Sequence, residues 1–120
     1  MIEGVIGVII WTDTLAVMRA FYSDVLGLKL HSERDGLIFY KWGNMRLGIG
    51  IHDKVKGKSV DPYRVMINLG VKNIFREYDS LVGKGVNFLR SPEQEKWGGW
   101  VSTFWDPDRN IIQLIQQPKV

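Results

Sequence analysis

The side chain that most suggests a binding role is Gln113, a lone polar residue in an otherwise apolar run. The preceding segment Asp106-Pro107-Asp108-Arg109-Asn110 predicts a tight turn, because proline fixes one backbone angle and Asp and Asn side chains cap nearby amides. Runs rich in β-branched and aromatic residues flank this turn and predict a β-hairpin. If Trp105 pairs with Ile111, then Thr103 pairs with Gln113 on the same face. We expect function to be decided at this position.

Few other residues could do chemistry. The two histidines are His31, in a polar segment, and His52, which ends a predicted strand and alternates onto the face of Gly48 and Gly50. No nucleophile elbow and no phosphate-binding glycine motif is present, so nucleophilic catalysis and nucleotide binding are unsupported. The chain has no cysteine, which excludes disulfides, thiol catalysis and cysteine-bound zinc.

Length and charge narrow the functional classes further. The 120 residues suffice for one domain with a sizeable core. The net charge of +3 is small and scattered, which argues against nucleic acid as a partner and slightly favours an anionic ligand over a polycationic one. No apolar run is long enough to span a membrane, and no signal peptide is recognisable at the N-terminus. We therefore expect a cytoplasmic protein without a membrane partner.

The first half of the chain predicts the order strand, helix, strand, strand, strand. Residues 5–11 form an apolar run suited to a buried strand. Apolar residues then recur at helical spacing over 15–26, and Gly27 stands where a C-cap glycine belongs. Three strands are predicted next, over residues 29–32, 37–42 and 45–52, with turns at 33–36 and 43–44.

The same order restarts after a polar, lysine-rich linker at about residues 54–61. Module one therefore covers about residues 1–53 and module two about residues 62–120. In module two we expect a strand over 64–71, a helix capped by Asn73 and ending at Gly85, a strand over 86–89, a flexible loop to residue 99, and the hairpin described above. Each module has about 60 residues, which is marginal for independent stability, so the two are expected to pack together as one domain.

Two motifs resemble those of the glyoxalase / bleomycin-resistance / ring-cleaving dioxygenase superfamily, also called vicinal oxygen chelate. Residues 21–30, Phe-Tyr-Ser-Asp-Val-Leu-Gly-Leu-Lys-Leu, are similar to its "FY…vLGf.l" helix end. Residues 106–114, Asp-Pro-Asp-Arg-Asn-Ile-Ile-Gln-Leu, are similar to its "DPDGN.iEl" hairpin. The resemblance implies an α+β, glyoxalase-like fold over residues 1–120, in which two βαβββ modules form a curved mixed sheet around a cleft.

The resemblance also locates the positions that hold a divalent metal ion in metal-dependent members of the superfamily. These positions lie on the first and last strand of each module and fall here on Gly7, Gly48, Met66 and Gln113. The superfamily usually has His, Gln or Glu there. Glycine offers no side-chain ligand, and a thioether suits soft copper(I) better than the ions used in this chemistry. We therefore expect neither a metal nor another cofactor.

Strand alternation and the resemblance together define a candidate ligand site with mostly apolar walls and a few polar anchors. Glycines on the same faces are expected to enlarge the cleft, and tryptophan would stack on a flat or conjugated ligand. The same aromatic residues could instead serve core packing or a dimer interface, and Trp100 is expected in the core. The candidate ligand-binding residues are Trp11, Phe39, Arg46, Gly48, His52, Met66, Asn68, Thr103, Trp105 and Gln113.

Three hypotheses follow for function. The first is a metal-free protein that binds a flat or amphipathic small molecule, as antibiotic-resistance members of the superfamily do. The second is a metal-dependent lyase or dioxygenase of the same superfamily, and the third is a structural or interaction domain whose cleft is filled by its own side chains. The resemblance further implies a homodimer. Gly98 and Gly99 would permit residues 92–99 to act as a lid.

Overall fold

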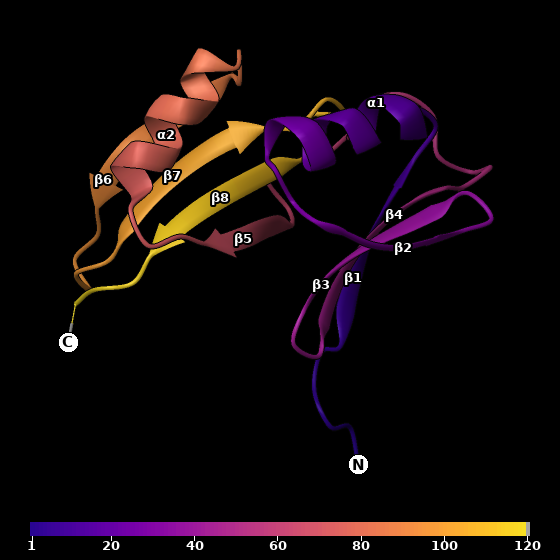
Figure 1. Ribbon diagram of the computed structural model, residues 1–120, viewed down its shortest axis with the longest axis horizontal. Coiled ribbons are helices and arrows are strands. Elements are labelled where there is room, and N and C mark those ends of the chain that lie inside the picture. The colour runs from indigo at the N-terminus through magenta and orange to yellow at the C-terminus, as the bar shows by residue number, and fades with distance from the viewer. Residues whose placement is uncertain (120) are drawn as a thin grey trace. The chain divides into compact units, whose positions relative to one another are not determined.

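The chain folds into two units, Met1–Gly57 and a second that begins at Lys58, which correspond to modules one and two. The computed structural model describes residues 1–119. Each module contains four strands and one helical segment in the order βαβββ (Figure 1). This confirms the α+β class and the repeated βαβββ order predicted from the sequence. The boundary between the units falls within the linker expected at residues 54–61.

In module one, an α-helix that continues as a π-helix follows the first strand. The elements are β1 (Gly7–Thr12), α1 (Leu15–Arg19), η1 (Ala20–Val25), β2 (Leu30–Arg34), β3 (Leu37–Trp42) and β4 (Met45–Ile51). The helical segment ends at Gly27, whose φ of 73° is the left-handed conformation that glycine adopts without strain. Apolar spacing predicted one helix here, because so short a segment does not distinguish α from π turns by its periodicity.

In module two, the order repeats with a longer helix. The elements are β5 (Met66–Gly70), α2 (Ile74–Gly83), β6 (Phe88–Gln94), β7 (Trp100–Trp105) and β8 (Ile111–Gln116). The Asn73 side chain accepts a hydrogen bond from the Arg76 N–H (3.1 Å) and caps α2, as predicted. The Gln116 side chain accepts from the Ile74 N–H (2.8 Å), so the last strand also satisfies a free amide of the helix.

The two sheets have the same topology. Their strand orders are β1-β4-β3-β2 and β5-β8-β7-β6, with one parallel pair (β1 with β4, β5 with β8) and antiparallel pairs elsewhere. The register of β7 and β8 matches the prediction, since Trp105 pairs with Ile111 and Thr103 with Gln113. The Asp106 carboxylate fixes the intervening turn by accepting from the Asp108 and Asn110 N–H groups and from the Asn110 amide.

Two predicted loops are shorter in the structure. Strand β2 continues to Arg34, and the turn into β3 is only Asp35-Gly36, with φ of 47° and 75°, as in a two-residue hairpin. Strand β6 extends through residues predicted to be flexible, because it pairs with β7 through register shifts between Phe88 and Glu93. The shifts accommodate Pro92, which has no N–H to give to a regular ladder.

The segment between the modules is anchored on both sides of the boundary. The Gly57 N–H donates to the Asp13 carboxylate (3.0 Å) within module one. The Ser59 N–H donates to the Asp108 carbonyl (2.8 Å), and the Lys58 ammonium donates to the Pro107 carbonyl, both within module two. Among residues 1–119, no helix is long and apolar enough to cross a membrane.

Candidate functional site

Each sheet has one face covered by its own helix and one face opposite that helix, here called its open face. In module one, Tyr22 of η1 packs near Tyr40 of β3, and Ser23 and Tyr40 share a hydrogen bond (2.7 Å). In module two, Phe75 of α2 packs edge-on against Trp100, so that tryptophan faces the helix as expected, but it is half-buried and does not belong to the core. Alternation along each strand therefore assigns every second residue to the open face.

The ten candidate residues divide equally between the two open faces. Module one contributes Trp11, Phe39, Arg46, Gly48 and His52. Strand pairing sets Phe39 beside Gly48. The His52 ring, just beyond the end of β4, packs edge-on against Trp11 (5.1 Å). Met66, Asn68, Thr103, Trp105 and Gln113 belong to module two. Strand pairing thus places the candidate residues of each module on one face of its sheet.

Gly48 and Gly50 of β4 do not leave open space. A Cβ atom on Gly48 would lie 2.8 Å from the Phe39 ring, and one on Gly50 would lie 2.6 Å from Leu37 and 3.0 Å from Trp11. Neighbouring side chains therefore lie flat across β4 because it lacks side chains at these two positions. The expectation that these glycines enlarge a cavity is wrong for Gly48 and Gly50. Gly70 of module two, in contrast, has nothing within 4 Å of its Cβ position.

The open face of module two carries a row of hydrogen-bonded polar side chains. The Thr103 hydroxyl donates to Gln113 Oε1 (3.1 Å), and Gln113 Nε2 donates to Asn68 Oδ1 (2.9 Å). Strand pairing aligns these three residues across β7, β8 and β5. Thr103 is buried and Asn68 is exposed, so the row leads from the interior of the sheet face to an amide in contact with solvent.

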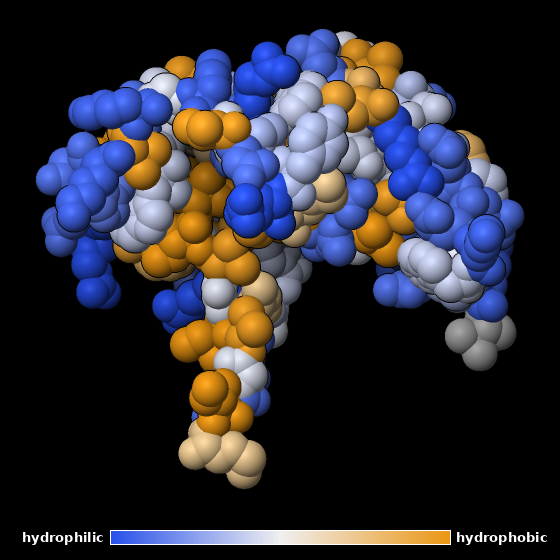
Figure 2. All heavy atoms as spheres, turned by 180° about the vertical axis from the view of Figure 1, so that it is seen from behind, coloured by the Kyte–Doolittle hydropathy of each residue, from blue (hydrophilic) through white to orange (hydrophobic). Residues whose placement is uncertain are grey.

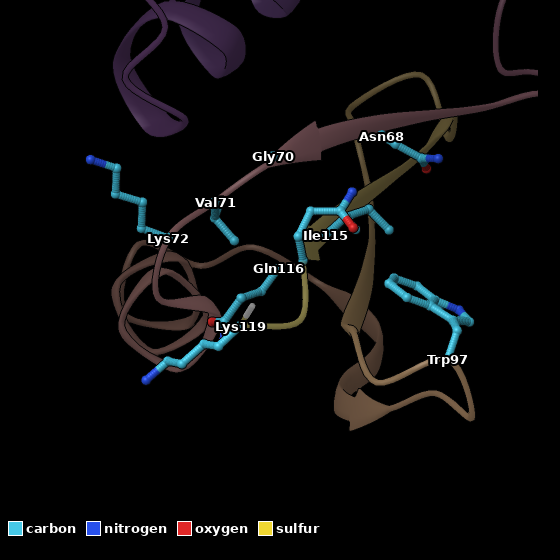
Figure 3. A pocket seen from close by; sticks show the side chains of 9 residues that line it. Asn68, Gly70, Val71, Lys72, Trp97, Ile115, Gln116 and Lys119 are labelled. Carbon is cyan, nitrogen blue, oxygen red and sulfur yellow. The ribbon is translucent and has the colours of Figure 1, made fainter.

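A groove of about 730 Å³ begins at the exposed end of this row. Figure 3 shows Asn68 and Trp97 on one side of it, Lys72 and Lys119 on the other, and Ile115 between them. Among the described residues that line the groove, none is acidic. The groove is lined by Asn68, Gly70, Val71, Lys72, Trp97, Ile115, Gln116, Gln117 and Lys119. It therefore combines an aromatic ring, small apolar side chains, amides and two cations.

Trp105 forms an aromatic cluster next to the row. The Tyr63 ring meets it edge-on at 6.3 Å, and the Arg109 guanidinium lies 4.7 Å from its centroid. A guanidinium at this distance is attracted by the negative face of an indole. The contacts hold Trp105 in place beside Met66 and Ile111, with which it shares a row of the sheet.

Arg90, a residue that the sequence did not suggest, extends the polar row onto β6. It pairs with Thr103 and donates to Glu95 (2.7 Å) and Glu93 (3.2 Å). The hydrogen bond that Arg90 donates to Glu95 is the main cause of a raised pKa for Arg90; burial opposes the rise, and the hydrogen bond donated to Glu93 adds to it. Simple alternation from Phe88 would place Arg90 on the helix-covered face, but the register shift between these two residues places it on the open face.

Comparison with known proteins identifies the family. The sequence profile described as Glyoxalase/Bleomycin resistance protein/Dioxygenase superfamily matches residues 5–114. The chain belongs to this superfamily. No curated protein matches the chain significantly.

Solved structures of the superfamily share the fold at low sequence identity. A superfamily member from Sphaerobacter thermophilus DSM 20745 is 20% identical with a TM-score of 0.77, covering 97% of this chain and 98% of that one. A putative glyoxalase family protein from Bacillus anthracis is 18% identical (TM-score 0.78; 98% and 97% covered). Lactoylglutathione lyase from Agrobacterium tumefaciens is 16% identical (TM-score 0.75; 96% and 94% covered). At these identities the likeness shows the fold alone.

The structure also relates the four positions that the superfamily resemblance assigns to metal ligands. Gly7 and Met66 each begin the first strand of their module. Gly7 pairs with Arg46 and Met66 pairs with Ile111 on the parallel partner strand. Gly48 lies two residues after Arg46, and Gln113 lies two residues after Ile111. Gly48 and Gln113 are therefore equivalent. Two glycines, a thioether and one amide whose oxygen already accepts from Thr103 do not fit a divalent cation. Among residues 1–119, no group of three or more His, Asp or Glu is placed to hold a metal ion.

Proposed function

We propose that this superfamily member binds a small, flat organic molecule on the open face of module two without the help of a metal ion. The hydrogen-bonded row of Thr103, Gln113 and Asn68 carries the proposal. Its central residue, Gln113, occupies the last-strand position at which metal-dependent members have a metal-coordinating side chain. In this chain the row offers amide and hydroxyl groups to an organic molecule instead. Such groups fix the orientation of an organic ligand, while apolar walls supply most of its binding free energy.

The groove gives this ligand a surface to occupy. Trp97 provides an aromatic face, and Gly70 and Ile115 provide a low apolar floor beside Asn68 (Figure 3). The Trp97 ring lies directly over Gly99, where a side chain would collide with it, so the hairpin backbone supports the ring from below. A supported ring loses little conformational entropy when a flat ligand stacks on it.

Fluorescence binding tests the proposal. Untagged protein treated with EDTA is titrated with N-phenyl-1-naphthylamine, a flat neutral dye, and with a panel of conjugated heterocycles that quench tryptophan. We expect saturable 1:1 binding of at least one compound, weakened about tenfold by Gln113→Ala, which removes one hydrogen-bonding side chain. Asn44→Ala is the matched control, since Asn44 is an exposed amide of module one that does not line this groove.

The outcomes separate the three functional hypotheses. Binding or turnover that appears only after a divalent ion is added would favour a metal-dependent lyase or dioxygenase. Absence of binding by every flat compound would favour a structural domain. In module one, the side chains that fill the space over Gly48 and Gly50 support that hypothesis.

We also propose that the protein forms a homodimer through apolar surface. Figure 2 shows apolar atoms gathered at the N-terminal end of module one. Val5, Ile6, Trp42 and Met45 are between 38% and 76% exposed there. A contiguous exposed apolar patch is a feature of interaction surfaces. Sedimentation velocity should return a species of twice 13.8 kDa at micromolar concentration, and a 13.8 kDa species alone would rule out the dimer.

A further inference from the structure

Two arginines with no acidic partner line one pocket on the open face of module one. The pocket has a volume of about 330 Å³ and is lined by Ser32, Glu33, Arg34, Leu37, Phe39 and Arg46. Strand pairing places Arg34 beside Leu37 and Ser32 beside Phe39, all on the open face. The Arg46 guanidinium lies 5.8 Å from the centroid of the Phe39 ring.

The absence of a carboxylate partner distinguishes these two arginines from others in the chain. Among residues 1–119, ion pairs with carboxylates are found for Arg19, Arg64 and Arg90, and none is found for Arg34 or Arg46. Glu33, the one acidic residue at the pocket, pairs with Arg19 of α1 on the opposite side of the sheet. Alternation along β2 therefore directs the carboxylate to the helix side and leaves Arg34 on the open face without a counter-ion.

The floor of the pocket is apolar and flat. Phe39 lies across the strand at Gly48, and Leu37 lies across it at Gly50, because neither glycine has a side chain to lift them. Strand pairing adds a third cation to this face, since Lys41 is aligned with Arg46. By the strand register, the open-face positions of β1 to β4 hold no acidic residue. The face thus offers an apolar surface bordered by positive charge.

We propose that this pocket binds an oxyanion, a carboxylate or phosphate, attached to a small aromatic body. Arg34 and Arg46 present planar guanidinium groups that can each donate two parallel hydrogen bonds to such an anion. The Ser32 hydroxyl lies at the same pocket and can donate a further one. The aromatic part of the ligand packs on Phe39 and Leu37. All the residues named for this site belong to module one.

Nuclear magnetic resonance with a matched pair of ligands tests the site residue by residue. Amide shifts of ¹⁵N-labelled protein are followed during titration with 2-naphthoate and with 2-naphthamide, which has the same ring system but no charge. We expect 2-naphthoate to shift the amides of residues 32–39 and 46 in a saturable way, with at least tenfold higher affinity there than 2-naphthamide. Inorganic phosphate should compete, and sodium chloride should weaken the binding.

Three variants complete the test. Arg34→Gln and Arg46→Gln should each reduce the affinity for 2-naphthoate about tenfold, as expected when a charge-assisted hydrogen bond is lost. Arg76→Gln removes the same charge from the exposed helix α2 of module two and should change nothing. Because the competition experiment needs no variant, the proposal stays testable even if a substitution disturbs folding.

Three results would overturn the proposal. They are equal affinity for the acid and the amide, unchanged affinity in both Arg34→Gln and Arg46→Gln, and shifts confined to residues outside the pocket. Shifts around Asn68, Gln113 and Ile115 report the groove of module two independently. The function proposed for module two and the oxyanion site of module one can therefore fail separately.

Discussion

Gln113 of module two occupies the sheet position that Gly48 occupies in module one. Gly48 pairs with Ile9 of β1, and Gln113 pairs with Asn68 of β5. Ile9 and Asn68 each lie two residues after the first residue of their strand. The same repeated architecture therefore yields an apolar surface in module one and a polar row in module two. This difference in side chains at equivalent backbone positions explains why we assign different ligand chemistry to the two open faces.

The hydrogen bond between Thr103 and Gln113 should be measurable as a coupling free energy. Thr103→Val removes the donor, and Gln113→Ala removes the acceptor. We expect each single variant to lower the free energy of unfolding, measured in urea, by about 1 kcal/mol. The double variant should lose less than the sum by roughly 0.5–1.5 kcal/mol, because the shared bond is lost only once. Strict additivity would mean that the two side chains do not interact.

Adding a methyl group to β4 should be more costly than adding one to β5. Gly48→Ala places a Cβ 2.8 Å from the Phe39 ring, and we expect a loss of about 1–3 kcal/mol in the free energy of unfolding as the ring is displaced. Gly70→Ala is the matched control, because nothing lies within 4 Å of its Cβ. That substitution should be neutral or should stabilise by about 0.4–1 kcal/mol. Thermal and urea unfolding of the pair gives the comparison, and equal losses would show that Phe39 does not lie over Gly48.

The turn before β8 should depend strongly on Asp106. This buried carboxylate accepts hydrogen bonds from the backbone of Asp108 and Asn110 and from the Asn110 side chain. Asp106→Ala leaves these donors without their acceptor, so we expect a loss of about 2–4 kcal/mol in unfolding free energy. Asp61→Ala is the control, since its ion pair with Arg64 is exposed and should contribute less than about 1 kcal/mol. Similar effects of both substitutions would refute this role for Asp106.

Tyr40 should make stability depend on pH in the alkaline range. Burial raises the pKa of Tyr40 above its usual value of 10.0, although the Ser23 hydrogen bond opposes the rise. The hydroxyl of Tyr40 therefore loses its proton at lower pH in the unfolded chain than in the folded chain. The stability that Tyr40 contributes to the fold is complete below about pH 10 and is lost as the pH rises through the folded-state pKa. The difference in unfolding free energy between the wild-type protein and Tyr40→Phe should therefore shrink between pH 9 and 11. A constant difference would contradict the burial of an ionisable hydroxyl, and Tyr63→Phe, at an exposed ring, is the control.

Much of the fold could be predicted because local chemistry and periodicity agree. The turn at residues 106–110 sets the register of β7 and β8, and this register places Thr103 beside Gln113. Asn73 and Gly27 mark helix ends for reasons that are visible in the sequence. The same turn and helix-end motifs carry the resemblance seen in the sequence, and the superfamily profile matches residues 5–114.

The parts that could not be predicted depend on contacts between distant residues. The residues around Pro92 have the composition of a loop, but they form a strand because they pair with β7. The register shift in this strand changes the face on which Arg90 lies, so alternation does not predict its position. The space over Gly48 is filled by Phe39 from another strand, which no feature of the glycine itself reveals. The lack of an acidic partner for Arg34 becomes visible only when Glu33 is seen to pair with Arg19.

The central claim, that binding needs no metal ion, is tested most directly by calorimetric titration of untagged, EDTA-treated protein with Zn²⁺, Ni²⁺ and Mn²⁺. Melting temperatures are followed in parallel, because an ion that binds only the folded state must raise them. We predict no saturable heat and no stabilisation, since Gly7, Gly48, Met66 and Gln113 offer too few suitable donors. A stoichiometric ion that stabilises the fold and is required for ligand binding would contradict the account and would make a metal-dependent enzyme the leading hypothesis.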